Sequence, residues 1–178
     1  MFIWIGCKLP EDFEFAIREK CRLLGEELGL ELSGFSLPQH ISLKISFEAG
    51  ENYGEILDFL EQMLRKEKKF YVNPNAAERM GDILWLSFRE NDTLQRLHNA
   101  LDKELNSRFA IPQHLFDKVF AFHTTLFMGD PEKLERAFGH LREMAIPEEL
   151  AVDTFLLGLS ESGKSGTYRV VRTICLVR

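Results

Sequence analysis

Cysteine is scarce in this sequence, and the few cysteines are not spaced for structural chemistry. Only Cys7, Cys21 and Cys175 occur, an odd number at long spacings with no Cys-x-x-Cys pair. Disulfide frameworks use even numbers of cysteines, and structural zinc sites use closely spaced pairs. The sequence therefore predicts three free thiols that serve as small, buried or half-buried hydrophobic side chains.

Long apolar runs are also missing. No stretch approaches the roughly 18 consecutive apolar residues that a membrane-spanning helix needs. Residues 1–10 hold one short apolar stretch without a basic flank or a small-residue cleavage site, which is typical of a first strand and not of a signal peptide. We therefore expect a cytoplasmic protein that makes no membrane contact.

Positive charge is in short supply. The 22 Lys and Arg are outnumbered by 28 Asp and Glu, which gives a net charge of -6. Broad binding to long nucleic acid needs many cations facing phosphates, so that class of partner is disfavoured. A local pocket for one or two phosphates stays compatible with this charge. The 178 residues, 45% of them hydrophobic, suit one monomeric domain or two small lobes sharing a core.

The sequence does contain strand and helix patterns that occur in the same order in each of its two halves. Ile3-Trp4-Ile5 and Leu84-Trp85-Leu86 are displaced by 81 residues, and His40 and His123 by 83. Period-two patterns predict strands at residues 2–8, 35–47, 70–75, 83–88, 120–128, 152–159 and 168–177, and apolar stripes predict helices over residues 13–28, 56–64, 94–105 and 134–141. Each half therefore reads strand, helix, His-bearing strand, helix, strand.

We interpret this pattern as an internal duplication within one domain, residues 1–178, with halves at about 1–80 and 81–178. The alternative is coincidence, because many α+β chains show such matches. A duplication would relate the two histidine strands by a pseudo-two-fold axis, so that their side chains could face each other across a groove.

The two histidine strands share the motif His-x-Ser/Thr-Leu. His40 is followed by Ser42 and Leu43, and His123 by Thr125 and Leu126. Residues two apart on a strand point the same way, so each motif presents an imidazole beside a hydroxyl. An imidazole can move a proton near neutral pH, and a hydroxyl can donate to a phosphate oxygen. Two such pairs predict acid–base chemistry on a phosphodiester.

With these motifs the sequence resembles the 2H phosphoesterase superfamily, in particular its 2′-5′ RNA ligase-like or cyclic phosphodiesterase members. The resemblance covers nearly the whole chain, and the segment from Leu159 through Tyr168 is similar to the family's closing hairpin. It implies an α+β fold with two antiparallel-sheet lobes, outer helices and a central groove that carries both motif strands.

The resemblance also implies an activity. The expected reaction is hydrolysis of 2′,3′-cyclic or related nucleotide or RNA-end phosphodiesters without metal or other cofactor, and reversible 2′-5′ RNA ligation in some relatives. Carried over by position, His40 and His123 are the acid and base, while Ser42 and Thr125 hold the phosphate. As further substrate contacts we consider Lys44, on the face of His40, against a solvated lysine, and Tyr168, against a half-buried strand tyrosine.

Three other readings of the sequence stay open. The first is a non-catalytic nucleotide or RNA-binding module with the same groove. The second is an NTPase, because residues 158–165 match the P-loop pattern; the β-rich residues that follow favour a hairpin instead. The third is a histidine metal site, disfavoured because neither motif has a second His, Asp or Glu on its face. The remaining histidines, His98, His114 and His140, are expected at the surface.

Overall fold

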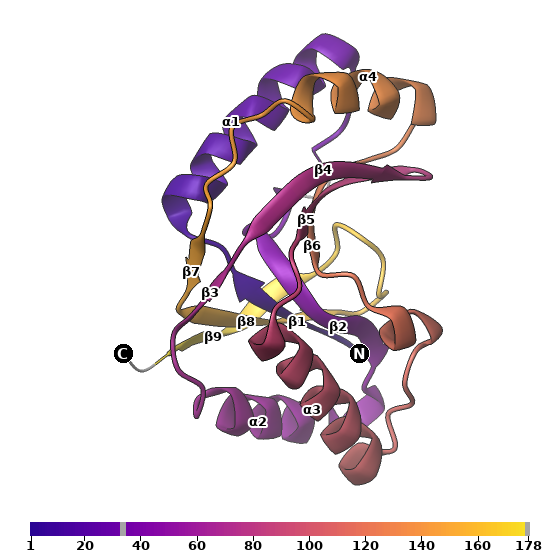
Figure 1. The fold of residues 1–178 in the computed structure, drawn as a ribbon. Helices are drawn as coiled ribbons and strands as arrows, with labels where there is room; N and C mark the ends of the chain where they lie inside the picture. Colours follow the sequence, from indigo (N-terminus) through magenta and orange to yellow (C-terminus); the bar gives the residue numbers. More distant parts are fainter. Residues whose placement is uncertain (33–34, 177–178) are drawn as a thin grey trace.

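The computed structural model describes residues 1–32 and 35–176 and confirms an α+β fold with two lobes (Figure 1). The first lobe contains a four-stranded sheet in the order β2-β1-β8-β9, and the second a three-stranded sheet in the order β4-β5-β6. A two-stranded ribbon of β3 and β7 lies where the chain passes between the lobes. The strands are β1 (Phe2–Lys8), β2 (His40–Glu48), β3 (Phe70–Val72), β4 (Pro74–Met80), β5 (Ile83–Phe88), β6 (His123–Met128), β7 (Leu150–Val152), β8 (Thr154–Ser160) and β9 (Arg169–Cys175). Every pairing is antiparallel.

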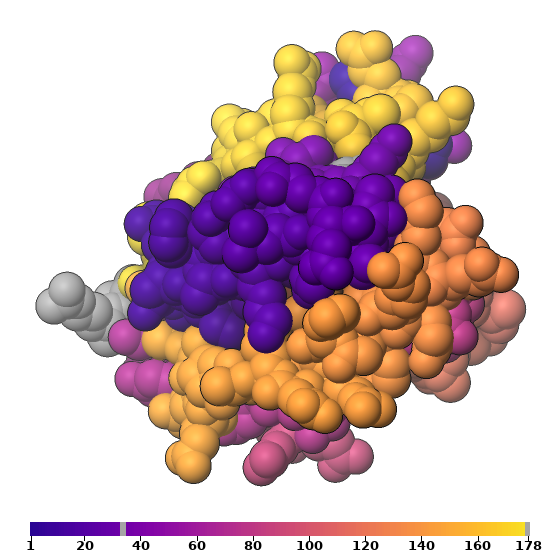
Figure 2. Space-filling view, turned by 90° about the horizontal axis from the view of Figure 1, so that it is seen from above, coloured from indigo at the N-terminus to yellow at the C-terminus, as the bar shows by residue number. Residues whose placement is uncertain are grey.

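The helices are exchanged between the lobes. Helix α1 (Glu11–Leu28) follows β1 in the chain, yet it packs beside α4 (Pro131–Leu141) in the lobe of β4, β5 and β6. Figure 2 shows these two helices, α1 in indigo and α4 in orange, side by side on one face. Helices α2 (Tyr53–Leu64) and α3 (Asp92–Phe109) cover the first sheet. The lobes therefore do not coincide with the halves 1–80 and 81–178, and the duplication stays a prediction.

Helix α1 illustrates why these segments fold as they do. Its apolar residues recur at helical spacing and are buried: Phe13, Ile17, Cys21, Leu24 and Leu28. Acidic residues occupy its first turn, where they complement the helix dipole. Gly29 ends the helix in the left-handed conformation, with φ 64°, that glycine adopts without penalty. The helix expected over residues 13–28 is confirmed, and it begins two residues earlier, at Glu11.

Other predicted boundaries are wrong in instructive ways. The strand expected at residues 35–47 begins only at His40, because Pro38 lacks the N–H that a sheet ladder needs. The strand expected at 120–128 begins only at His123. Strand β4 was not expected, since most of its residues (Pro, Asn, Ala, Ala and Glu among Pro-Asn-Ala-Ala-Glu-Arg-Met) are types that are scarce in strands; it forms the edge of the second sheet. The predicted end of the last strand, Val177, lies outside the described residues.

The segment that matches the P-loop pattern is a hairpin. Strand β8 ends at Ser160, a loop follows, and β9 returns antiparallel beside it, with Leu159 opposite Arg169. A P-loop must lead into a helix whose N-terminus holds the phosphates. The NTPase reading is therefore wrong, and the hairpin reading is confirmed. Among the described residues, no helix is both long and apolar enough to cross a membrane.

Candidate active site

The two motif strands are tied together by a buried pair of polar side chains. Gln39 immediately precedes His40, and Thr124 immediately follows His123. The Thr124 hydroxyl donates to Gln39 Oε1 over 2.6 Å, and Gln39 Nε2 donates to the carbonyl of Thr125 over 3.4 Å. Both side chains are buried, so water does not compete for these bonds. The link fixes β2 against β6 and sets the spacing of the two histidines.

Both imidazoles are held in the same way. His40 Nδ1 lies 2.7 Å from the carbonyl oxygen of Pro38, and His123 Nδ1 lies 2.7 Å from that of Ala121. A carbonyl only accepts hydrogen bonds, so each Nδ1 carries a proton and donates it. In the neutral ring the lone pair therefore resides on Nε2. Each histidine thus presents a base, or once protonated an acid, at the atom opposite its backbone anchor.

An indole packs against each imidazole. The ring centroids of Trp4 and His40 are 4.2 Å apart with an interplanar angle of 66°, an edge contact. Those of Trp85 and His123 are also 4.2 Å apart, but the angle of 28° makes this a stacked contact. A stacked indole face attracts a cationic ring, whereas an edge contact does so less. The two histidines therefore sit in related but unequal surroundings.

The two indoles reach their histidines by different routes. His40 lies opposite Lys8, four residues after Trp4, whereas His123 lies opposite Ser87, two residues after Trp85. The longer reach of Trp4 passes over Gly6, where any Cβ would collide with the indole.

The indole of Trp4 also prepares the neighbouring hydroxyl. Trp4 Nε1 donates to Ser42 Oγ over 3.0 Å. Because the hydroxyl accepts this bond, its own proton is free to donate to a ligand. Trp85 Nε1 is buried and has no partner among the residues that the structure describes.

Burial lowers the pKa of both imidazoles. The pKa of His40 is lowered to about 4, mainly by burial; the bond to Pro38 opposes this and repulsion from His123 adds to it. Burial also lowers the pKa of His123, while the bond to Ala121 and the negative charge of Glu78 oppose the shift.

A groove pocket of about 300 Å³ lies beside His40 and gathers most of the predicted site residues. It is lined by Trp4, Ser36, Leu37, His40, Ser42, Ser46, Thr125, Met128, Gly163, Ser165, Gly166 and Tyr168. Hydroxyls from both motifs, Ser42 and Thr125, therefore face one space. Tyr168 lies at its wall, where its hydroxyl donates to the carbonyl of Gly163 over 3.4 Å.

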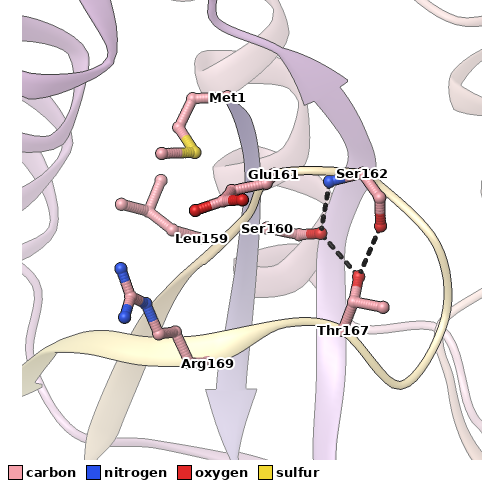
Figure 3. A pocket seen from close by; sticks show the side chains of 7 residues that line it. All are labelled: Met1, Leu159, Ser160, Glu161, Ser162, Thr167 and Arg169. Carbon is pink, nitrogen blue, oxygen red and sulfur yellow. Dashed lines mark hydrogen bonds between the residues drawn. The ribbon is translucent and has the colours of Figure 1, made fainter.

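The wall of this pocket formed by residues 161–168 is held by a closed set of hydroxyl bonds. Figure 3 shows Ser160, Ser162 and Thr167 pointing toward one another at the base of the loop. The Thr167 hydroxyl donates to the carbonyl of Lys164 over 2.6 Å, so it accepts from Ser160 at 2.6 Å and from Ser162 at 3.0 Å. The loop is thereby preorganised without any ligand.

Lys44 is not in the groove, so the prediction that it contacts phosphate is wrong, as is the solvated alternative. Register shifts in the β1–β2 pairing place Lys44 opposite Ile5, whose side chain points into the core. Its ammonium is buried and bonded to the carboxylates of Asp102 and Asp117, the latter at 2.6 Å. Because of this β-bulge, the Lys44 side chain points into the core, where it belongs to a structural ion cluster and not to the candidate site.

His98 belongs to the same interior region, and its expected surface position is also wrong. It lies on the buried face of α3 and is only 1% exposed. Its Nδ1 is 2.8 Å from the carbonyl oxygen of Leu43, and its Nε2 is 2.9 Å from that of Asp117. The helical spacing of Leu94, Leu97 and Leu101 could have indicated this burial, because His98 falls on the same stripe. His114 and His140 are exposed, as predicted.

The bilobal fold and the facing His-x-Ser/Thr strands define the 2H phosphoesterase class. The model of the 2′-5′ RNA ligase superfamily matches residues 34–163, and the chain belongs to this family. No curated protein matches the sequence.

Solved structures share the fold over nearly the whole chain. TT0787 of Thermus thermophilus is 19% identical, with a TM-score of 0.67, 98% of this chain covered and 97% of that one. Escherichia coli LigT complexed with 3′-AMP is 20% identical, with a TM-score of 0.63 and coverage of 99% and 98%. Usb1 of Kluyveromyces marxianus is 13% identical, with a TM-score of 0.56 and 98% of both chains covered. At these identities the likeness concerns the fold.

Proposed function

We propose that the protein is a metal-independent phosphodiesterase that hydrolyses 2′,3′-cyclic or related nucleotide and RNA-end phosphodiesters. The observation that carries this proposal is the matched anchoring of two imidazoles, each with Nδ1 on a backbone carbonyl and Nε2 left for chemistry. Membership of the 2′-5′ RNA ligase superfamily supports it. So does the binding of 3′-AMP and of phosphate by LigT, which has the same fold.

The unequal surroundings of the histidines suggest their roles. Glu78 and the stacked face of Trp85 both favour a positive charge on His123, so we assign His123 as the acid. His40, whose pKa is lowered to about 4, is the base. His40 Nε2 takes a proton from water as the water oxygen bonds to phosphorus. The bond from phosphorus to the ribose oxygen breaks, and His123 Nε2–H protonates that oxygen.

The hydroxyls complete the site. Ser42, whose proton is left free by the bond from Trp4, donates to one phosphate oxygen. Thr125, on the opposite strand, donates to another. Such preorganised donors stabilise the charge that grows on these oxygens in the transition state. Tyr168 is proposed to contact the sugar or base from the hairpin wall.

A non-catalytic nucleotide or RNA-binding module remains the alternative function. A module of this kind needs a groove with hydrogen-bond donors for phosphate. It does not need two imidazoles whose Nε2 atoms are both left available for proton transfer by matching Nδ1 bonds. Purified protein that binds adenosine 2′,3′-cyclic phosphate without converting it to a monoester would support the module and contradict the enzyme.

We expect the turnover of adenosine 2′,3′-cyclic phosphate to be equal in excess EDTA and with added Mg²⁺ or Zn²⁺. Each motif offers a single Nε2, and no three His, Cys, Asp or Glu side chains converge as potential ligands in residues 1–32 and 35–176. The measurement is the rate of monoester formation, followed by chromatography. An enzyme that EDTA inactivates and a metal restores would contradict the proposal.

The pH dependence of kcat/KM should be bell-shaped, with its maximum on the acidic side of pH 6.5. Activity needs one neutral and one protonated imidazole, and both pKa values are lowered in the free enzyme. Above the bell both rings are neutral and the acid is missing; below it both are protonated and the base is missing. The two midpoints belong to the coupled pair. A rate that rises steadily through alkaline pH would instead indicate hydroxide attack.

A further inference from the structure

A second pocket, of about 450 Å³, adjoins the strand position of His123 and is here called the distal pocket. It is lined by Asn75, Glu78, Ser87, Phe88, Arg89, Glu90, Asn91, Asp92, Gln95, Phe120, Ala121 and Phe122. Two of these residues flank His123 directly: Ser87 is its partner across β5 and β6, and Ala121 accepts its Nδ1 proton. The distal pocket therefore lies next to the proposed acid.

The charge of the distal pocket is unfavourable for a phosphate. Three carboxylates line it, from Glu78, Glu90 and Asp92, against the single guanidinium of Arg89. The Glu78 carboxylate is fixed at the groove by a bond of 2.6 Å from the Ser87 hydroxyl. Close to such a set of carboxylates, a phosphate dianion is repelled, with only partial screening at physiological salt.

The amino end of α3 does not offset this charge. Helix N-termini can hold anions through their free amides. Here Asn91 Oδ1 already accepts from the amides of Thr93 and Leu94, at 3.1 and 3.0 Å. Asp92 adds its own negative charge to the first turn. The helix end at this pocket is therefore occupied and neutralised.

The remaining chemistry of the distal pocket suits an uncharged nucleoside. Phe120 is half-buried and supplies an apolar wall, backed by the buried rings of Phe88 and Phe122. Carboxylate oxygens accept hydrogen bonds from ribose hydroxyls and from the amino groups of bases. By contrast, no Lys, Arg, Asp or Glu appears among the described residues that line the His40 pocket.

We propose that the substrate carries a single phosphate, held at the two histidines, with its nucleoside in the distal pocket. The inference rests on the proposed function and narrows it to nucleoside 2′,3′-cyclic phosphates that have no 5′-phosphate. Glu78, Glu90 and Asp92 select against a second phosphate group. One imidazolium is then sufficient to balance the single negative charge of the cyclic phosphodiester.

The test compares adenosine 2′,3′-cyclic phosphate with the same compound bearing a 5′-phosphate. We expect kcat/KM to be about tenfold lower for the 5′-phosphorylated compound, a factor that shrinks as salt is raised. Glu90→Gln combined with Asp92→Asn should bring the ratio closer to one. The matched control, Glu51→Gln with Glu55→Gln, removes the same charge near the start of α2 and should leave the ratio unchanged.

The opposite preference would overturn the proposal. Equal or faster turnover of the 5′-phosphorylated compound does so, and so does a selective loss of that turnover in Arg89→Gln, which would assign Arg89 to a second phosphate. Calorimetric measurement of the binding of 3′-AMP and of adenosine 3′,5′-bisphosphate tests the single-phosphate selection separately from the phosphodiesterase activity. A binding preference for 3′-AMP without any turnover would refute the phosphodiesterase but keep the single-phosphate selection; turnover without preference would do the reverse.

Discussion

Replacing His40 or His123 by alanine is expected to lower kcat/KM for a 2′,3′-cyclic nucleotide by about 10²–10⁴-fold while leaving the fold intact. General acid or base catalysis by a positioned side chain typically contributes this much. Each imidazole is anchored through Nδ1 to the backbone carbonyl two residues before it in the chain. Neither ring takes part in the Gln39–Thr124 link, so removing a ring leaves that link in place. Steady-state kinetics measure the loss of kcat/KM, and circular dichroism shows whether the fold is intact.

The double variant should lose less than the product of the two single losses. Acid and base act in one step, and once either is missing the other has less to contribute. His140→Ala is the matched control, because His140 is exposed on α4 and its side chain makes no hydrogen bond within residues 1–32 and 35–176. Full activity in either single variant would remove that histidine from the mechanism, and equal losses in His140→Ala would mean that the assay reports stability.

The pairing of an imidazole with a hydroxyl in each motif is predictable from sequence because it depends only on local geometry. An imidazole and a hydroxyl two residues apart on a strand must share a face, whatever the strand pairs with. That rule needs no partner, so it placed His40 beside Ser42 and His123 beside Thr125. The helix ends were local too: Gly29 closes α1, and Asp130 caps α4 with bonds to the amides of Glu132 and Lys133.

What the sequence could not supply is the pairing between distant segments. The exchange of α1 and α3 between lobes depends on which sheet face is free, which no single segment records. Lys44 was misplaced for the same reason, since its orientation follows from a register shift against β1. Strict alternation along β2 predicts that the Lys44 side chain faces the groove, whereas the observed bulge turns this side chain toward the core.

Removing the Lys44 ammonium should be among the most destabilising single changes in the protein. In Lys44→Met, the carboxylates of Asp102 and Asp117 lose their cation, although both remain buried. Breaking a buried ion pair from one side typically costs about 3–5 kcal/mol, because a charge is left without compensation. Urea unfolding should show this loss as a lower midpoint with an unchanged slope.

Two further variants test the physical reason. Lys8→Met removes an ammonium whose partner, Glu11, is exposed, and surface pairs are worth only about 0–1 kcal/mol. Lys44→Met combined with Asp102→Asn and Asp117→Asn removes the uncompensated charges and should recover part of the stability. A loss in Lys44→Met no larger than that in Lys8→Met would contradict the account of a buried cluster.

The same cluster should also affect catalysis, because it joins the supports of the two histidines. Burial raises the pKa of the Asp117 carboxyl, yet the Lys44 ammonium and the amides of Ile45 and His114 outweigh burial and lower it below its ordinary value. Asp117 lies in the short helix Leu115–Val119, which ends four residues before His123. Its carboxylate accepts hydrogen bonds from Lys44 and from the amide of Ile45, both on β2, the strand of His40. With the cluster broken, this helix is no longer fixed to β2. Under conditions where Lys44→Met is still fully folded, we therefore expect kcat to fall while the bell-shaped pH profile persists.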